Sequence, residues 1–387
     1  MRKITIETSS KYDVLIGNGI LEKAGEHLQE VLKCDKLCIV SDETVYGLYG
    51  QELFEALENA DYKVCVFTVP AGEDSKNMDT VSKLLEFMAK EQLTRVDAIV
   101  AFGGGVIGDL AGFVAACYLR GISFVQIPTT LLAAVDSSVG GKTGVNLSHG
   151  KNLAGAFWQP SLVFCDTHLF KSLSQTILLD GIAEIIKYGV IADKELFEFM
   201  FVNDFRTLIE SNGLTCKRSA TKINRTENNS TPDKMRIESI VDIVARCVKI
   251  KAEIVSQDER DTGKRMLLNF GHTLGHAIEK CSNYEISHGH AVAIGMRYIS
   301  HIATIMEILR PNDTVRIAKI LKKYNFSLTC DYSAKELYEA ALVDKKRAGN
   351  TITEVFPNKI GSCRLEQVDI FSFEELIKEA LSSVEKE

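Results

Sequence analysis

The sequence lacks any apolar run long enough to cross a membrane, since no stretch approaches the ~18 to 20 residues that a transmembrane helix needs. Its first residues, M-R-K-I-T-I-E, alternate in polarity and contain no apolar signal-peptide core. A Cys-x-x-Cys pair is also absent, and the 10 cysteines are scattered, most of them in apolar segments. We therefore expect a cytoplasmic protein whose cysteines are buried, reduced thiols rather than disulfides or zinc ligands.

A surplus of positive charge is missing as well. The chain has 45 lysines and arginines against 52 aspartates and glutamates, a net charge of -7, and a pI of about 5.7. Because a phosphate backbone attracts a basic face, this balance argues against nucleic acid as the main partner, although a local basic cluster can still bind a small anion. The sequence contains no internal repeat and no low-complexity segment. At 387 residues and 45% hydrophobic content, the chain is long enough for two globular domains.

The first part of the chain alternates between strand and helix patterns. A strand pair is predicted at residues 2–7 and 12–16, followed by helices at 21–32, 45–57 and 81–90 and strands at 36–42, 63–69, 97–102, 124–128 and 162–166. Such alternation is typical of a parallel sheet flanked by helices, which binds ligands at the carboxyl ends of its strands. We expect an α/β domain over residues 1–169.

Three of those strand ends carry polar or glycine-rich segments, at residues 41–44, 70–76 and 103–109. The last contains G-x-G-x-x-G between a strand and a helix, a setting in which glycines allow backbone N–H groups to face a pyrophosphate. The usual dinucleotide fingerprint follows the first strand and is matched by an acid ~20 residues later, whereas this one follows about the third parallel strand and lacks that acid. A variant dinucleotide or phosphate loop and a tight structural turn both fit.

A second dense segment spans residues 129–152 and is predicted to be a long, polar loop. It presents Asp136, Lys142, Lys151 and Asn152 among glycines and small residues. Lysines on a glycine-rich backbone suit a phosphorylated or carboxylated substrate. The alternative is a solvated surface loop, which the apolar valines threaded through the segment make less attractive.

From about residue 170 to 387 helical patterns dominate, so a second, mainly α-helical domain is expected. A helix is predicted at residues 181–200, where Glu184 and Lys187 are three apart among apolar neighbours; such a carboxylate is more often paired with its lysine than bound to a metal. Residues 211–236 are polar and indicate a mobile loop or an insertion. A helix at 237–255, two short strands at 351–356 and 360–365 and a C-terminal helix complete the domain.

Four of the eight histidines fall between residues 265 and 296. His272 and His276 are four apart in a helical pattern, so their rings share one face, and His288 and His290 follow after a turn. With one carboxylate from elsewhere, such histidines can supply the three protein ligands of a catalytic zinc. The competing interpretation is ordinary histidines that cap helices or form hydrogen bonds in a core.

Taken together, a series of motifs resembles the 3-dehydroquinate synthase family of sugar phosphate cyclases over about residues 1 to 370. The motifs are G-G-G-V-I-G-D-L-A-G-F, I-P-T-T-L-L-A-x-V-D-S-S-V-G-G-K-T, G-K-N-L-A-G-A-F, G-x-A-E-I-I-K, K-A-E-I-V-S-Q-D-E-R-D, L-N-F-G-H-T-L-G-H-A-I-E, S-H-G-H-A-V-A-I-G-M and D-K-K. The resemblance implies an N-terminal NAD-binding domain, a helical C-terminal domain, one active site between them and a homodimer.

The resemblance also implies roles for individual residues. Zinc, or cobalt in its place, is expected on Glu184, His272 and His288. NAD is expected against Asp42, Glu73, Lys76, Gly104, Gly105, Val106, Gly108, Asp109, Thr129, Thr130, Lys142 and Lys151. Substrate and catalytic contacts are expected from Asp136, Lys142, Asn152, Lys187, Lys251, Arg265, Asn269, His276 and one of Lys345 or Lys346, with Arg120 reaching the neighbouring subunit's site.

The implied activity is that of a carbon–oxygen lyase of the shikimate pathway, which leads to aromatic amino acids. Such an enzyme converts 3-deoxy-D-arabino-heptulosonate 7-phosphate to 3-dehydroquinate and phosphate. NAD transiently oxidises the C5 hydroxyl and so acidifies the neighbouring C–H, and the metal polarises that oxygen. Phosphate elimination follows, with His276 or the substrate's own phosphate as base, and then reduction, ring opening and an intramolecular aldol reaction.

One position departs from the family, which usually has H-G-E where this chain has His288-Gly289-His290. A spare histidine there is expected to compete for the metal or to alter its neighbours' pKa. Three rival functions remain: a related cyclase that makes an inosose or a valiolone, an NAD- and metal-dependent polyol dehydrogenase, and a non-catalytic binding protein. Asn152, His276 and Arg120 favour dehydroquinate over the other cyclase products, and the 136–143 and 150–152 motifs argue against the dehydrogenase.

Overall fold

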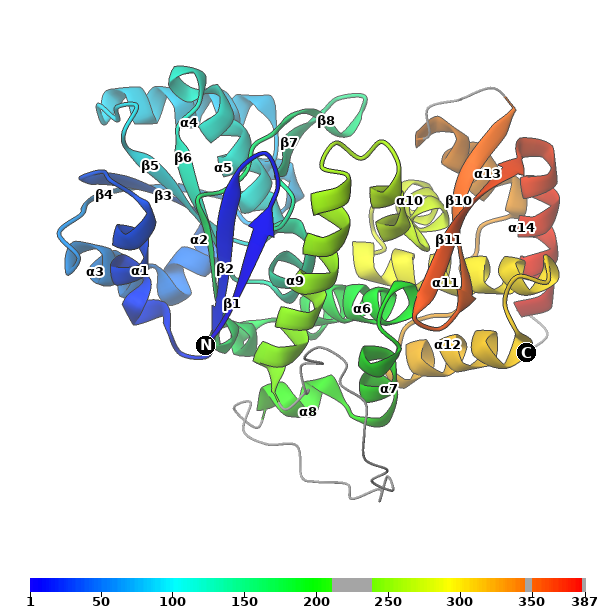
Figure 1. Ribbon diagram of the computed structural model, residues 1–387. Helices are drawn as coiled ribbons and strands as arrows, with labels where there is room; N and C mark the ends of the chain where they lie inside the picture. Colours follow the sequence, from blue (N-terminus) through cyan, green and yellow to red (C-terminus); the bar gives the residue numbers. More distant parts are fainter. Residues whose placement is uncertain (211–238, 345–349, 385–387) are drawn as a thin grey trace, which may run out of the picture.

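The computed structural model describes residues 1–210, 239–344 and 350–384 (Figure 1). Its N-terminal half is built on a seven-stranded sheet in the order β1-β2-β9-β6-β5-β3-β4, in which every neighbouring pair is parallel except β1 with β2. The strands are β1 (Arg2–Glu7), β2 (Lys11–Gly17), β3 (Lys36–Asp42), β4 (Lys63–Val69), β5 (Ala98–Gly103), β6 (Ser123–Pro128) and β9 (Leu162–Asp166). The predicted parallel-sheet domain is therefore confirmed.

Helices cover both faces of this sheet, which explains why its central strands are apolar along their whole length. Ile99 and Ala101 of β5 pack with α4 (Met78–Lys90) and α5 (Gly105–Cys117). The alternate residues Val100 and Phe102 pack on the opposite face with α1 (Ala24–Val31) and α3 (Gln51–Glu58). All six residues of β5 are buried, and the glycines that follow it emerge at the carboxyl edge of the sheet.

Two segments of the N-terminal half differ from the prediction. The helix expected from Val45 begins at Glu43, because Oδ1 of Asp42 caps it by accepting a hydrogen bond from the Val45 N–H. The prediction of a loop over residues 129–152 was wrong for its second part. This part forms a hairpin of β7 (Lys142–Leu147) and β8 (Gly150–Phe157). Val145 of this hairpin is fully buried in the same core as α5, and this tertiary contact favours the strands.

The C-terminal half is mainly helical, as expected. Its elements are α6 (Gln175–Ile191), α7 (Lys194–Val202), α8 (Phe205–Glu210), α9 (Ile240–Gln257), α10 (His272–Cys281), α11 (His288–Ile305), α12 (Pro311–Lys323), α13 (Ala334–Asp344), β10 (Thr351–Lys359), β11 (Ser362–Asp369) and α14 (Ile370–Val384). Helix α6 packs against α7, α9 and α11, and α9 lies against β1 where the two halves meet (Figure 1). None of the described helices combines the length and apolar character that crossing a bilayer requires.

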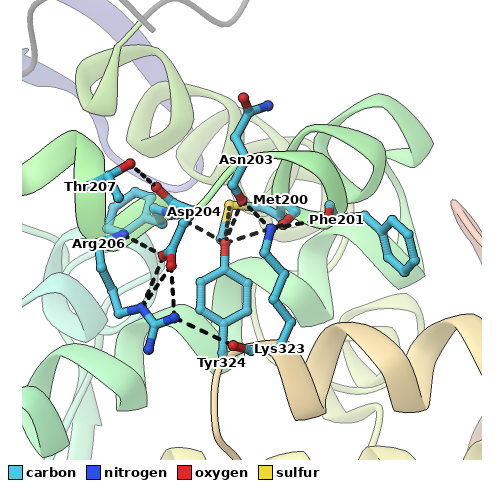
Figure 2. Close-up of polar contacts among 9 residues, drawn as sticks. Met200, Phe201, Asn203, Asp204, Arg206, Thr207, Lys323 and Tyr324 are labelled. Atoms are coloured by element: carbon cyan, nitrogen blue, oxygen red, sulfur yellow. Dashed lines mark hydrogen bonds and ion pairs between the residues drawn. The ribbon is translucent and has the colours of Figure 1, made fainter. Parts of the chain in front are cut away.

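The helix predicted at residues 181–200 is two helices, α6 and α7, separated at Ala192 and Asp193. The C-terminal end of α7 is hydrogen-bonded to the C-terminal end of α12 (Figure 2). There the Lys323 ammonium donates hydrogen bonds to the main-chain oxygens of Met200 and Asn203, among others, and Tyr324 accepts one from the Phe205 N–H. The insertion predicted at residues 211–236 lies outside the described residues.

Candidate active site

Two adjoining cavities lie between the halves of the molecule. The first, of about 840 Å³, opens over the carboxyl ends of β3, β4, β5 and β6, where a parallel sheet binds its ligands. The second, of about 620 Å³, lies between the β7–β8 hairpin and helices α6, α9 and α10. Both are lined by Asp109, Asp136, Asn152 and His288, so the two cavities meet at these side chains.

Most residues expected to contact NAD line the first cavity. They are Asp42, Glu73, Lys76, Gly104, Gly105, Val106, Asp109, Thr129, Thr130 and Lys151. Gly108 does not line it: a Cβ there would lie 2.7 Å from Oε1 of Gln126, so this glycine permits close packing of α5 on β6. Lys142 lines the second cavity instead.

The G-x-G-x-x-G segment connects β5 directly to α5, as a phosphate loop requires. Helix α5 begins at Gly105, so the unpaired N–H groups and partial positive charge of its N-terminus lie at the first cavity. A Cβ on Gly104 would lie 3.0 Å from Cγ2 of Thr130, and one on Gly105 would lie 3.0 Å from Oγ of Ser137. The glycines thus keep side chains out of a position suited to a pyrophosphate.

A lysine on the wall of this cavity connects the loop after β4 with α5 and with the hairpin. The Lys76 ammonium is buried and donates hydrogen bonds of 2.6 Å to Oδ2 of Asp109 and 2.6 Å to Oδ1 of Asn152. Burial raises the pKa of Asp109, and Lys76 offsets only part of that rise. A residue expected to bind NAD and one expected to bind substrate therefore contact each other here.

The three residues expected to bind metal come together although they belong to three different helices. Oε1 of Glu184 on α6 lies 3.5 Å from Nε2 of His272 on α10 and 3.6 Å from Nε2 of His288 on α11. Ligands 2.0–2.1 Å from a tetrahedral zinc lie about 3.3 Å apart, so both of these distances are close to the spacing that one zinc ion would require. Glu184 is fully buried, and its Oε1 accepts no hydrogen bond from any described residue.

The charged groups of this cluster strongly shift one another's pKa. Burial raises the pKa of Glu184, but Lys187 and His272 reverse this and bring it to about 2, and the Lys187 ammonium contacts Oε2 directly. Burial lowers the pKa of His288, whereas the carboxylates of Glu184 and Glu279 raise it to about 10. Burial and Lys187 hold the pKa of His272 well below its usual range. The negative potential around His288 favours a cation at this point.

Close backbone approach holds α6 and α11 together. Oδ1 of Asp180, one turn before Glu184, accepts hydrogen bonds from Oγ of Ser287 (2.6 Å) and from the Gly289 N–H (2.8 Å). A Cβ on Gly289 would lie 2.3 Å from Cα of Asp180, so only glycine fits there. Asp180 thereby holds the first turn of α11, which carries His288, against α6, which carries Glu184.

His290 lies apart from the metal ligands. Its Nδ1 is 2.9 Å from Oγ of Ser287, and its ring packs edge-on against Phe326 with centroids 5.1 Å apart. It belongs to neither group of converging ligand atoms found among the described residues. The structure therefore gives no support to competition between His290 and the ligands.

The second cavity gathers most of the residues expected to contact the substrate. It is lined by Asp136, Lys142, Asn152, Lys187, Lys251, Arg265, Asn269 and the ligands His272 and His288, while His276 lines the first cavity. Arg265 is held by the main-chain oxygens of Glu259 (2.6 Å) and Gly140 (3.1 Å). Four cationic side chains therefore face a single cavity, an arrangement suited to an anionic ligand.

One residue expected to contact substrate is not brought to the cavities. Arg120 is exposed in the turn between α5 and β6 and lines neither cavity. Lys345 and Lys346 lie outside the described residues.

Four further residues of the site were not predicted. Tyr188 donates a hydrogen bond to Asp136, Asp261 pairs with Lys142, Asp180 caps α11, and Glu279 contacts His288. Glu279 follows His276 by three residues on α10, and this spacing is the one sequence signal that could have placed it on the same helix face.

Comparisons with known proteins agree on one family. Residues 66–180 match the family model described as 3-dehydroquinate synthase N-terminal, and residues 181–347 match the corresponding C-terminal model. The chain is 41% identical over 371 residues to the 3-dehydroquinate synthase of Streptococcus gordonii, covering 95% of this chain and 97% of the relative. It is 38% identical over 362 residues to that of Clostridium acetobutylicum, covering 93% and 94%.

Solved structures share the fold. A 2-epi-5-epi-valiolone synthase from Streptomyces hygroscopicus, with NAD+ and Zn2+ bound, matches with a TM-score of 0.83 at 25% identity, covering 99% of both chains. A 2-deoxy-scyllo-inosose synthase complexed with carbaglucose-6-phosphate, NAD+ and Co2+ matches with a TM-score of 0.79 at 24% identity, covering 98% of this chain and 99% of the other. An iron-containing alcohol dehydrogenase, with a TM-score of 0.64 at 17% identity, covers 97% and 99% and shares the fold alone.

Proposed function

Since this chain belongs to the 3-dehydroquinate synthase family, we propose that it converts 3-deoxy-D-arabino-heptulosonate 7-phosphate to 3-dehydroquinate and phosphate. The observation that carries the proposal is the convergence of Glu184, His272 and His288 where a glycine-lined cavity meets a lysine-lined one. The first cavity suits a dinucleotide and the second a small, multiply charged anion. The enzyme would be an NAD- and metal-dependent carbon–oxygen lyase.

The residues present fit both expected cofactors. Glu184, His272 and His288 would hold Zn2+ or Co2+, since three converging ligand atoms with a further position facing a cavity are the usual set of a catalytic site. NAD would lie with its pyrophosphate at the N-terminus of α5, between Asp42 and Thr130. When bound, NAD supplies a temporary hydride acceptor and the metal a Lewis acid for a substrate oxygen.

The chain's own residues then bind and orient the substrate. Lys142, Lys251 and Arg265 would hold its carboxylate and phosphate, and Asp136 keeps the Lys251 ammonium in place through a 2.8 Å ion pair. His276, on the wall of the first cavity, would take or return a proton beside the metal position. Fixing both ends of a flexible chain favours the conformation that can close into a ring, so positioning supplies much of the rate.

We further propose a cytoplasmic homodimer in which residues 1–169 bind NAD and residues 170–387 supply the metal ligands. Exposed Leu119 and Arg120 both adopt positive φ (49° and 70°), a conformation that costs energy in non-glycine residues and often marks a functional turn. This turn would carry Arg120 to the partner's site. The nine cysteines of the described chain are all free, which suits a reducing compartment.

The test is an assay that follows phosphate release and NADH absorbance together, with purified protein, NAD, Zn2+ and the heptulosonate phosphate. We expect phosphate release without net NADH, because the hydride returns in every turnover. His272→Ala should abolish release, whereas His168→Ala, which removes an exposed histidine outside both cavities, should not.

Other outcomes would identify a rival function. Accumulation of NADH would indicate a polyol dehydrogenase. Turnover of sedoheptulose 7-phosphate or glucose 6-phosphate, without turnover of the heptulosonate, would indicate a valiolone or inosose cyclase.

A further inference from the structure

We propose that Glu279 is a positioning residue of the metal centre, whose carboxylate holds the Nδ1–H of His288 and thereby directs Nε2 of that ring to the metal. The inference rests on the proposed function, in that it assigns a role beside the same three ligands. It concerns a residue that lines the first cavity but not the second and is not one of the three expected ligands.

The two nitrogens of His288 face two different carboxylates. Nε2 lies 3.6 Å from Oε1 of Glu184, and Nδ1 lies 3.3 Å from Oε2 of Glu279. A neutral imidazole that binds a metal through Nε2 carries its proton on Nδ1 and donates it to an acceptor, which fixes both the tautomer and the ring orientation. Glu279 is that acceptor.

The other histidine ligand, His272, has a different acceptor for its Nδ1–H. Its Nδ1 lies 3.2 Å from the main-chain oxygen of Phe270, two residues earlier. Both histidine ligands thus have an acceptor on Nδ1, but only that of His288 is a side chain. Glu279 is therefore the one of these two acceptors that a substitution can remove.

The surroundings of Glu279 suit a structural carboxylate. Its side chain is 9% exposed, and Oε1 lies 3.6 Å from the Lys151 ammonium, which itself lies 3.9 Å from the centroid of the Tyr284 ring. Lys151 comes from the β7–β8 hairpin, so a cation from the N-terminal half compensates the charge of Glu279 in the C-terminal half. A buried carboxylate without such a partner would be costly.

A competing role for Glu279 is to bind a second metal ion, since ligand atoms of His276, Glu279 and His288 also lie within 4.8 Å of one another. That role would require Nδ1 of His288 to lose its proton while Nε2 binds the first metal. It would also bring a second cation close to the Lys151 ammonium. Both requirements are unfavourable, so the geometry points to positioning.

The experiment measures Zn2+ affinity of the metal-free, full-length protein by competition with a chromophoric chelator, without NAD or substrate. Glu279→Ala should weaken binding about 10- to 100-fold, the usual effect of losing such a partner. Glu279→Gln keeps an acceptor oxygen but loses the negative charge, so it should bind zinc several-fold more weakly than wild type and more tightly than Glu279→Ala. Glu285→Gln removes an exposed carboxylate from the turn between the same two helices and should change nothing.

A second readout separates positioning from general damage to the fold. With Co2+ in place of zinc, the visible absorption of the Glu279→Ala protein should shift, whereas that of the Glu285→Gln protein should match wild type. If the alanine variant does not fold, a Gln variant with several-fold weaker zinc binding and an unchanged melting curve of the metal-free protein supports the proposal, and a Gln variant with wild-type affinity refutes it.

Two further results would overturn the inference. One is wild-type zinc affinity in folded Glu279→Ala. The other is binding of two zinc ions by wild type, with loss of only the weaker one in Glu279→Ala, which would establish the second-metal role. Because no substrate is present, a protein that shows the expected affinity pattern but fails the phosphate-release assay would refute the proposed function alone.

Discussion

The ammonium nitrogen of Lys251 lies 2.8 Å from Oδ1 of Asp136 and 2.7 Å from the main-chain oxygen of the same residue. Lys251 is buried at the wall of the second cavity, and burial lowers its pKa from 10.5 to about 8, although Asp136 opposes the shift. A cation expected to bind an anionic substrate therefore loses its charge close to physiological pH.

The first prediction is that kcat/KM falls above pH about 8 as Lys251 deprotonates. Lys251→Arg should retain the charge and move this decline to higher pH. The larger arginine side chain should also lower the rate at all pH values. Parallel pH–rate profiles of the two proteins test this. A wild-type profile that stays flat to about pH 9.5 would contradict it.

The lowered pKa of Lys251 also predicts that stability rises over the pH range in which activity falls. This opposite trend serves as a control. Between pH 8 and 10.5 the unfolded chain binds a proton at Lys251 that the folded chain does not. The contribution of this group to the free energy of unfolding therefore rises with pH across that window. A loss of activity above pH 8 with no matching fall in the melting temperature would thus report the site and not unfolding.

Contact between helices α10 and α11 gives the second prediction. A Cβ on Gly295 would lie 2.0 Å from the main-chain oxygen of Gly271, directly before His272, and 2.8 Å from the nitrogen of Gly275. Gly295→Ala should push the helices apart, lower the free energy of unfolding by about 1–3 kcal/mol and weaken zinc binding. Urea denaturation and zinc titration measure the two effects. Gly47→Ala, where a Cβ would meet no atom within 4 Å, should lower neither the stability nor the zinc affinity.

The strands of the N-terminal half could be predicted because buried parallel strands are apolar along their length. Val100 and its neighbours in β5 show this directly. The β7–β8 hairpin could not, because its glycines and lysines have a loop-like composition and the strands depend on packing of Val145 against α5. The break between α6 and α7 was also missed, since no proline or glycine marks Ala192 or Asp193.

The site also contains residues that local sequence patterns indicate and residues that only tertiary contacts bring together. Helical spacing alone indicated that His272 and His276 share a face. Glu184 lies far from them in the sequence, so only the family resemblance identified it as a metal ligand. Which histidines converge on it is decided by the close crossings of α6, α10 and α11. Glu279 was overlooked because a glutamate three residues after a histidine is ordinary on a helix surface, and only the fold shows that it is buried against His288.

Metal binding should stabilise the protein, which is the third prediction. An ion that binds the native state alone, present at about 100 times its Kd, contributes about 2.7 kcal/mol. Adding Zn2+ to chelator-treated protein should therefore raise the melting temperature by roughly 3 °C. His272→Ala should remove most of this shift, and His168→Ala should retain it. An equal shift in the His272→Ala protein would place the stabilising ion elsewhere.

The fourth prediction concerns the junction of α7 and α12 (Figure 2). The Lys323 ammonium donates to three main-chain oxygens, those of Met200, Phe201 and Asn203, at the end of α7, where helical carbonyls have no partner within the helix. Lys323→Met should leave the Phe201 oxygen without its donor, and the Met200 and Asn203 oxygens with the Tyr324 hydroxyl alone. We expect this to lower the free energy of unfolding by about 1–2 kcal/mol.

Lys322→Met is the matched control, because this neighbouring lysine is exposed and its loss should change stability by less than about 0.5 kcal/mol. Urea denaturation of both variants measures the difference. Zinc affinity should be unchanged in each, since Lys323 contacts none of the residues that line the cavities. Equal stability of the two variants would mean that water replaces the ammonium at these carbonyls without loss, and that the junction is held by Tyr324 and the packing around it.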